Sequence, residues 1–371
     1  MFWAGRFGAA FRRLSTLGLA RLCGVVVVFC AASLRAETTT FAVIGDYGVD
    51  TPSSALVAAM VASWNPAFVV TVGDNTYGDQ NINVEEWERR IGQHYGRFIL
   101  GRGDNRYPSQ TSATQRFFPS VGNHDVIDPP AGAVDPPPGP PFYTGSQNAI
   151  RPGYLDYFHI DPANAAGRLP VGNHEPRASY YDFRWGPAHF FALDSESAFV
   201  DSDSAEQQAE WLQTTAAASD AQWKFVYFHH SPYSSGAHGD QLYMQWPFAE
   251  WGISAVLTGH DHTYERVWRD GIPYFVNGLG GQGTYQFLNI TAGSVERYNE
   301  NHGAMRIAFD ERSATFEFIA AVPNDDGSFA PIVVDRFSLA AVVPEPPASV
   351  TWTAAAVALR WRRLFRRAAL G

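Results

Sequence analysis

The sequence predicts an α/β fold in which two mixed β-sheets pack against each other and are flanked by helices. Apolar runs typical of strands alternate with segments of helical spacing in the earlier part of the chain. A series of strand-like runs follows at its end, which favours two packed sheets. Hydrophobic residues make up 46% of the 371 residues, which is ample for a large core. We find no internal repeat.

The first elements share one pattern, in which an apolar strand runs into a tight polar turn. Such strands are predicted within residues 39–48, 67–78 and 117–125. Helical spacing is found in residues 52–64 and 84–95. Residues 128–141 are rich in proline, which removes backbone donors, so we expect a surface loop near the rim of the site.

The later elements begin with a strand pair in residues 178–195, which is expected to turn at Gly186-Pro187. Residues 204–218 predict a helix, and residues 240–252 predict a second one that Pro247 interrupts. Further strands are predicted in residues 223–230, 254–262, 272–278, 304–311, 314–322 and 332–339.

Residues 1–36 have the composition of a secretory signal. They contain five arginines and no acidic residue, and they include the apolar run VVVVFCAA with small residues at its exit. The run is too short for a comfortable membrane span, although an N-terminal anchor helix is the alternative. Cleavage would follow Ala32 or Ala36. We therefore expect an exported protein, in the periplasm, at the cell surface or outside the cell.

Residues 341–371 predict a sorting or membrane tail. Their order of a Pro-Glu-Pro triplet, a weakly apolar stretch and five arginines resembles the PEP-CTERM tails of Gram-negative bacteria. That resemblance implies processing by a membrane-embedded exosortase. Without it, an apolar stretch before a basic cluster still favours membrane insertion, and a solvated amphipathic tail is the alternative. The catalytic domain is expected between the two ends, in residues 37–340.

Cysteine content and charge narrow the chemistry of that domain. Both cysteines, Cys23 and Cys30, lie in the predicted signal, so a metal would be held by His, Asp, Asn or Tyr alone. The chain carries a formal charge of −10, and its arginine-rich ends contribute +5 and +4, which leaves −19 for the middle. A basic face for nucleic acid is therefore not expected, and metal ions would be needed to attract an anionic substrate.

Five segments combine an apolar strand, a tight turn and side chains that can bind metals. They are GDYG with Asp46, GDNTY with Asp74 and Tyr77, GNHD with Asn123 and His124, HHSPY with His229 and His230, and GHDH with His260 and His262. Strand ends at one edge of a sheet tend to carry function, and glycine lets the backbone turn sharply there. Oxygen and imidazole ligands without sulfur suit Fe, Zn, Mn or Ni. Because one carboxylate can bridge two ions, we predict a site for two metals.

The order of these five motifs resembles the calcineurin-like metallophosphoesterases. The tyrosine in GDNTY resembles, more narrowly, their purple acid phosphatase branch. The resemblance spans residues 40–320 and is closest to the compact, tartrate-resistant form, since the chain has no room for the extra N-terminal β domain of the large plant enzymes. It implies a four-layer sandwich, with helices outside two packed sheets.

The resemblance also implies a role for each residue. One metal, Fe(III) in the family, would bind Asp46, Asp74, Tyr77 and His262. The second metal, Fe(II), Zn or Mn, would bind Asp74 as a bridge together with Asn123, His230 and His260. His124 would contact the phosphate or the leaving group, and His238 matches the family's substrate-facing histidine, a candidate general acid. A phenolate from Tyr77 would stabilise Fe(III) and give the purple colour; the alternative is a packed aromatic ring.

Two motifs leave a choice between similar residues. In HHSPY we choose His230 as the ligand, because it directly precedes Ser-Pro as the family ligand does, and His229 is then a strand-face residue. The sequence GNHE at 172–175 imitates GNHD at 122–125, but only the earlier copy follows an apolar strand. We therefore assign His174 to a loop.

The predicted function is that of an exported acid phosphatase that hydrolyses small phosphate monoesters. The resemblance implies in-line attack by a hydroxide that the metals hold, with His238 or His124 protonating the leaving alkoxide. A phosphodiesterase of the same superfamily is the first alternative, since its metal ligands would be nearly identical. A zinc-only site is another. A non-catalytic surface or matrix protein on a decayed scaffold is disfavoured, because no ligand is missing. The oligomeric state is not predicted.

Overall fold

The computed structural model of this protein describes residues 37–77, 82–101, 103, 105–126, 153–158, 179–196 and 202–341. The predicted signal, the tail beyond Ala341, the proline-rich segment 128–141 and His174 lie outside the described residues. Within the described part of the chain, no helix is long and apolar enough to cross a membrane.

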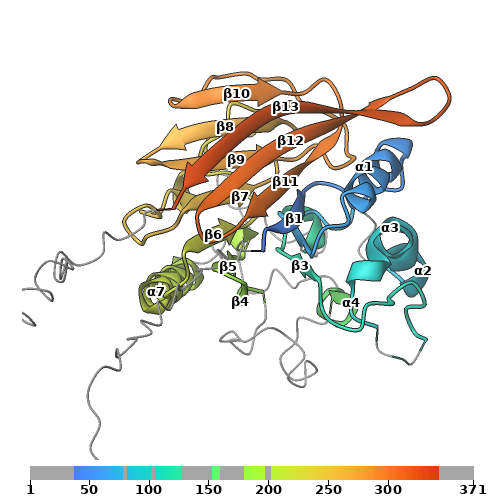
Figure 1. Cartoon of the computed structure of the whole chain (residues 1–371), viewed down its shortest axis with the longest axis horizontal. Coiled ribbons are helices and arrows are strands. Elements are labelled where there is room, and N and C mark those ends of the chain that lie inside the picture. The colour runs from blue at the N-terminus through green and yellow to red at the C-terminus, as the bar shows by residue number, and fades with distance from the viewer. Residues whose placement is uncertain are drawn as a thin grey trace, which may run out of the picture. The chain divides into compact units, whose positions relative to one another are not determined.

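Two mixed β-sheets form the body of the protein (Figure 1). The strands of the first sheet are β1 (Thr39–Ile44), β2 (Val69–Thr71), β3 (Phe117–Pro119), β11 (Gly303–Phe309), β12 (Ser313–Pro323) and β13 (Phe329–Ala340). Those of the second sheet are β4 (Tyr181–Trp185), β5 (Ala188–Ala192), β6 (Trp223–Tyr227), β7 (Ala255–Thr258), β8 (Tyr264–Arg269), β9 (Ile272–Asn277) and β10 (Ser294–Tyr298). Their spatial orders are β13-β12-β11-β1-β2-β3 and β10-β8-β9-β7-β6-β5-β4.

Parallel strands occupy the part of each sheet that carries the motifs. In the first sheet β1, β2 and β3 are parallel neighbours, and in the second β5, β6, β7 and β9 are. The other pairs are antiparallel, including β4 and β5, which turn at Gly186 as expected. The predicted fold class, two mixed sheets with few helices, is therefore confirmed.

The helices lie outside the sheets. They are α1 (Pro52–Ser63), the short α2 (Val84–Trp87), α3 (Gln93–Tyr95) and α4 (Tyr154–Phe158), and α7 (Ser202–Ala218). Between α2 and α3 the chain continues as one turn of π-helix, so residues 84–95 are helical as predicted. Helix α1 begins with a capping box, in which Thr51 and Ser54 each accept the other's backbone N–H, and it packs against β11 and β12.

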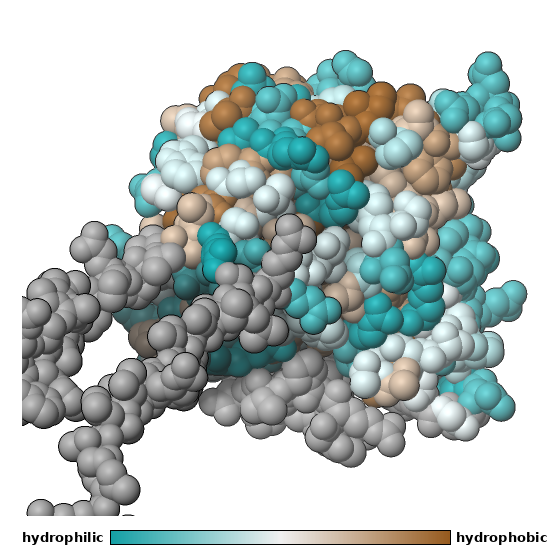
Figure 2. Space-filling view, viewed as in Figure 1, coloured by the Kyte–Doolittle hydropathy of each residue, from teal (hydrophilic) through white to brown (hydrophobic). Residues whose placement is uncertain are grey.

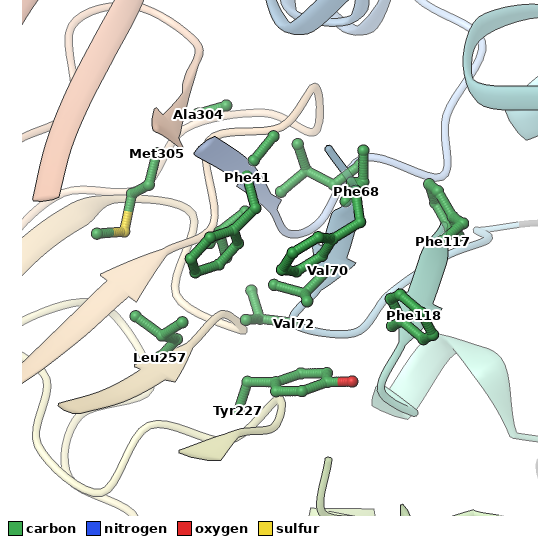
Figure 3. Packing of buried hydrophobic residues seen from close by; sticks show 14 of the residues in the cluster. Phe41, Phe68, Val70, Val72, Phe117, Phe118, Tyr227, Leu257, Ala304 and Met305 are labelled. Atoms are coloured by element: carbon green, nitrogen blue, oxygen red, sulfur yellow. The ribbon is translucent and has the colours of Figure 1, made fainter. Parts of the chain in front are cut away.

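Phenylalanine rings fill the space between the two sheets (Figure 3). Phe41 of β1 stacks on Phe68, and its ring lies 5.2 Å from that of Phe190 in β5 and 6.1 Å from that of Phe225 in β6. All four side chains are fully buried. Burial of each such ring stabilises the fold by about 2–3 kcal/mol, so these contacts hold the two sheets in a fixed relation.

One predicted helix is wrong. Residues 240–252 form only a short 3-10 turn, η4 (Leu242–Met244), followed by further turns. Pro247 has no N–H for a helical hydrogen bond, and Gly252 adopts a left-handed φ of 75°. The helical spacing of apolar residues is explained instead by Met244, Phe248 and Ile253, which the turns bury against the second sheet.

Three elements were not predicted, namely α4, β8 and β10. Strands β8 and β10 carry many charged residues, which conceal the alternation of apolar and polar residues.

Figure 2 shows apolar side chains gathered on the face that the later strands form in Figure 1. Exposed apolar residues of these strands are Trp268, Val295, Ile332 and Val333.

Candidate metal centre

The polar turns after five strands meet at one place. Asp46 follows β1, Asp74 follows β2 and Asn123 follows β3 in the first sheet, whereas His229 and His260 follow β6 and β7 in the second. Two hydrogen bonds join the sheets here. The His260 N–H donates to Asp46 Oδ2 at 3.1 Å, and the His229 imidazole Nδ1 lies 2.9 Å from the Val72 carbonyl oxygen.

Three of these turns are held in a strained backbone conformation. Asp46, Asp74 and His260 have φ values of 55°, 52° and 69°, in the left-handed region that residues other than glycine rarely adopt. Such a conformation costs on the order of 1–3 kcal/mol and persists where the surrounding structure enforces it. Three strained residues at three predicted ligands mark this edge as a functional site.

The first group of ligand atoms comes from Asp46, Asp74, Tyr77 and His262. One ligand atom from each of Asp46, Asp74 and His262 lies within 4.8 Å of the others, and all three side chains are buried. The Tyr77 hydroxyl lies 3.2 Å from Asp46 Oδ1 and 3.2 Å from His262 Nε2. The four residues expected for the first metal therefore lie together.

The second group shares Asp74 with the first and adds three further side chains. The Nε2 atom of His229 lies 2.9 Å from Asn123 Oδ1, 3.4 Å from Asp74 Oδ1 and 3.2 Å from His260 Nδ1. His260 Nδ1 in turn lies 3.1 Å from Asn123 Oδ1. Asn123 and His260 are thus beside Asp74, as expected for a second metal.

The choice between the two adjacent histidines is corrected. His229 directs its Nε2 at this group. Nδ1 of His230 lies instead 3.1 Å from Ser195 Oγ and 3.0 Å from Glu196 Oε1, in a separate buried polar cluster. The reason is that consecutive side chains of an extended segment point to opposite sides. The ring of His230 also packs beside the group, with its centroid 4.3 Å from that of His260.

The hydrogen bonds behind the site fix which imidazole nitrogens face inward. A carbonyl oxygen only accepts, so Nδ1 of His229 donates to Val72 and Nδ1 of His262 donates to Gly283, the latter at 2.6 Å. In the neutral rings, Nε2 then presents a lone pair. These lone pairs face the oxygens of Asn123 and Asp74, or of Asp46. Acceptor atoms that face one another in a buried site are stabilised by a proton or a metal ion between them, and imidazole and oxygen ligands suit Fe, Zn or Mn.

Burial and local charge shift the pKa values of these groups. Burial lowers the pKa of His260 well below its usual value, and the nearby His230 and His229 act in the same direction. Burial would also lower the pKa of His262, but its hydrogen bond to Asp46 and the carboxylate charge raise it overall. Burial, then the charges of Asp46 and Asp74, raise the pKa of Tyr77 well above its usual value. A phenolate at Tyr77 would therefore require a metal ion to offset that negative charge.

The two candidate catalytic histidines lie beside these groups and are exposed. The backbone N–H of His124 donates to Asp74 Oδ1 at 2.9 Å, and its ring packs 4.4 Å from that of Tyr77. The ring of His238 stacks 4.0 Å from that of His260. Both imidazoles are therefore placed at the solvent side of the ligand groups, where a substrate would approach.

Two residues near the site had no predicted role. Asp125 is fully buried and accepts the N–H groups of Gly122, Asn75 and Thr76, so it ties two of the turns together. Burial and the charge of Asp74 raise its pKa to about 7. Asp125 is the last residue of the GNHD motif, so the sequence did contain a signal for it. Tyr285 stacks on His262, with ring centroids 4.1 Å apart, and it lies in a loop without a motif.

Comparison with known proteins identifies the family of this chain. A family model described as calcineurin-like phosphoesterase matches residues 39–264. The chain is 25% identical over 328 residues to a phosphoenolpyruvate phosphatase of Allium cepa, a match that covers 79% of this chain and 59% of that protein. It is 26% identical over 259 residues to Fe(3+)-Zn(2+) purple acid phosphatase 12 of Arabidopsis thaliana, covering 65% and 46%. The chain thus spans about half the length of the curated relatives it matches.

Solved structures show the same fold at lower identity. Purple acid phosphatase PPD1 from yellow lupin (Lupinus luteus) seeds has a TM-score of 0.55 and 16% identity, and the match covers 82% of this chain and 54% of that one. GAP50, described as the anchor in the inner membrane complex of Plasmodium, has a TM-score of 0.54 and 17% identity, with coverages of 83% and 90%. The family model spans most of this chain and includes every motif whose side chains meet at the strand ends. The chain therefore belongs to the calcineurin-like phosphoesterase family and, within it, is similar to the purple acid phosphatases.

Proposed function

We propose that this protein is an exported phosphatase that hydrolyses small phosphate monoesters at a centre of two metal ions. The observation that carries the proposal is the convergence of lone pairs at the strand ends. Nε2 of His229 lies 2.9 Å from Oδ1 of Asn123 and 3.4 Å from Oδ1 of Asp74, and the hydrogen bond from its Nδ1 to the Val72 carbonyl orients the ring. The similarity to proteins named as phosphatases supports the same reaction.

The residues of the chain would hold two cations in adjoining places. The first set is Asp46, Asp74, Tyr77 and His262, and the second is Asp74, Asn123, His229 and His260. Asp74 belongs to both sets and is therefore the proposed bridge. Fe(III) in the first place and Fe(II), Zn or Mn in the second suit these ligands. When bound, such a pair supplies a nucleophile at neutral pH and positive charge for the phosphoryl oxygens.

The remaining steps fall to the two exposed histidines. His124 follows directly on Asn123 and packs on Tyr77, so it is placed to bind a phosphoryl oxygen. His238 packs on His260, next to the second set of ligands, so it is placed to give a proton to the leaving oxygen. Proton transfer of this kind accelerates a reaction by roughly 10²–10⁴-fold, and most where the leaving group is a poor one.

Metal analysis together with a visible spectrum tests the metal centre. We expect about two metals per chain, at least one of them iron, and a purple colour that Tyr77→Phe removes. An unchanged spectrum in the mutant would exclude Tyr77 as a ligand, and a colourless, iron-free protein would show a zinc-only site.

Substrate comparison tests the reaction. We expect hydrolysis of p-nitrophenyl phosphate to exceed that of bis-p-nitrophenyl phosphate. The reverse preference would show a phosphodiesterase, and hydrolysis of neither ester would reject the enzyme function. Export is tested separately, by the N-terminal sequence of the protein from the periplasmic and extracellular fractions.

A further inference from the structure

The loop that carries His238 is fastened to the body by two buried carboxylates, Asp261 and Glu265. The loop runs from Ser231, within the HHSPY motif, to Gln241, and we call residues 231–241 the His238 loop. Asp261 lies between the two histidines of GHDH, and Glu265 lies in β8. Their exposed fractions are 1% and 0%.

Asp261 accepts hydrogen bonds from both sides of the loop. Its Oδ1 accepts the backbone N–H of His238 at 2.8 Å, and its Oδ2 accepts the Ser234 hydroxyl. The loop approaches so closely that a Cβ atom on Gly236 would lie 2.3 Å from Asp261 Cγ. The side chain of Asp261 therefore binds the His238 loop, although Asp261 lies between the proposed ligands His260 and His262 in the sequence.

Glu265 holds the same loop at Ser235, three residues before His238. Its Oε2 accepts the backbone N–H of Ser235 at 2.7 Å, and its Oε1 accepts the hydroxyls of Ser235 and Ser294. The Ser235 hydroxyl in turn accepts the backbone N–H of Thr291 at 3.0 Å. Hydrogen bonds to a charged carboxylate are about twice as strong as neutral ones, so these contacts restrict the loop strongly.

The carboxylates fix the backbone on both sides of a short exposed turn that ends at His238. Because the His238 N–H itself is held, the starting point of its side chain is fixed relative to the strand end after β7. Its ring then stacks on that of His260, with centroids 4.0 Å apart, and contacts the edge of Tyr285 at 5.5 Å. A catalytic group displaced by about 1 Å can lose roughly 10²-fold in rate, so fixing this backbone matters for a proton transfer.

We propose that Asp261 and Glu265 are positioning residues, which hold His238 where it protonates the leaving oxygen of the substrate. This inference rests on the proposed phosphatase function. In the step concerned, the bond between phosphorus and the leaving oxygen breaks, and that oxygen keeps the electron pair and takes a proton from His238. Water supplies the oxygen that becomes bonded to phosphorus and, over the turnover, the proton that returns to His238.

The kinetic test uses two monoesters that differ in their need for a proton. p-Nitrophenolate leaves without protonation, whereas the alkoxide of glycerol 2-phosphate requires it. For Asp261→Ala and Glu265→Ala we expect kcat on glycerol 2-phosphate to fall about 10- to 100-fold, with p-nitrophenyl phosphate within about threefold of wild type. His238→Ala should show the same selectivity with a larger loss. Adding either carboxylate change to His238→Ala should cause no further loss, since both act through His238.

A second test does not depend on activity. Hydrogen exchange of the metal-loaded and metal-depleted protein should speed up about tenfold or more at the His238 amide in Asp261→Ala and at the Ser235 amide in Glu265→Ala. Asp182→Ala is the matched control, because Asp182 is an equally buried carboxylate of the same sheet that binds His189 instead. It should leave both the exchange of the loop and the leaving-group selectivity unchanged.

Several results would overturn the proposal. Equal losses on both esters, a further loss in the double variants, or unchanged exchange at Ser235 and His238 would each show that the carboxylates do not position His238. Normal metal content in Glu265→Ala is needed for the first comparison, and Glu265 is not a proposed ligand. If wild type hydrolyses neither ester, the proposed function fails and this proposal fails with it; if wild type is active and only the selectivity is absent, this proposal alone fails.

Discussion

Replacing His229 and His230 by alanine, one at a time, tests which of the two adjacent histidines binds the second metal. His229→Ala removes one of four proposed ligands of the second metal, and three remain. We expect the metal content to fall from about two to about one per chain. His230→Ala removes a ring whose Nδ1 contacts Ser195 and Glu196, outside both ligand sets. We expect it to keep both metals.

The magnitudes follow from what each ring contacts. Loss of a residue that only supports a ligand weakens metal binding by about 10- to 100-fold, and loss of a ligand should exceed this. Each variant also loses a buried hydrogen bond of its ring, to the Val72 carbonyl in one and to the Ser195 hydroxyl in the other, at about 1–3 kcal/mol each. Melting temperature therefore does not distinguish them, and metal affinity does.

The assay is dialysis of both variants and wild type against a series of buffered free-metal concentrations, followed by metal analysis of the protein. The ligand assignment is refuted if His230→Ala loses a metal and His229→Ala keeps two. Equal loss in both variants would mean that the two rings act as one unit, which the separate hydrogen bonds of His229 and His230 argue against.

Three further predictions concern the metal site and the fold. Removal of the metals by a chelator should lower the melting temperature by roughly 10 °C, because a ligand at 1,000 times its Kd stabilises by about 4 kcal/mol, and differential scanning calorimetry would show no shift if the site held no metal. Gly122→Ala should abolish activity, since its Cβ would lie 2.2 Å from the backbone nitrogen of Asp74, whereas Gly283→Ala, with no atom within 4 Å of its Cβ, should retain it in the same assay. Burial raises the pKa of Glu317, but two neighbouring arginines lower it overall, so the folded value lies below the unfolded one. This carboxylate therefore stabilises at neutral pH and loses its effect as the pH falls through the folded pKa. Glu317→Gln should cost about 1–2 kcal/mol at pH 7 and less at pH 2, as urea unfolding at the two pH values would reveal.

The sequence predicts the fold well where strands are buried on both faces. β1, β2 and β7 are continuous apolar runs because a sheet covers one face and helices or turns cover the other. β8 was missed because Glu265 is buried by hydrogen bonds to serines and not by hydrophobic contact, so it reads as a surface residue. The segment 240–252 was read as a helix because turns can bury apolar residues at the same spacing.

The sequence predicts which strand ends carry the site, but it does not show on which face of a strand each side chain lies. A polar motif after a strand locates Asp46, Asp74 or His260, since parallel strands end at a common edge. His229 and His230 are consecutive, and only the phase of β6 decides which of them points inward. The sequence signals that phase only through Lys224, the one charged residue of β6, since the strand is otherwise apolar on both faces. Tyr285 could not be predicted at all, since it reaches His262 from a loop between β9 and β10.

The site and the core of this protein make opposite contributions to its stability. Three strained turns and a cluster of facing lone pairs are each unfavourable in the protein without metal. They persist because β1, β2, β6 and β7, the strands that carry them, are anchored by fully buried side chains on both sheets, among them Phe41, Phe68 and Phe225. A bound cation removes the repulsion between the lone pairs but leaves the strained φ values. The aromatic core therefore determines where the ligand atoms lie before any metal arrives, and the metal then adds stability to a geometry that already exists.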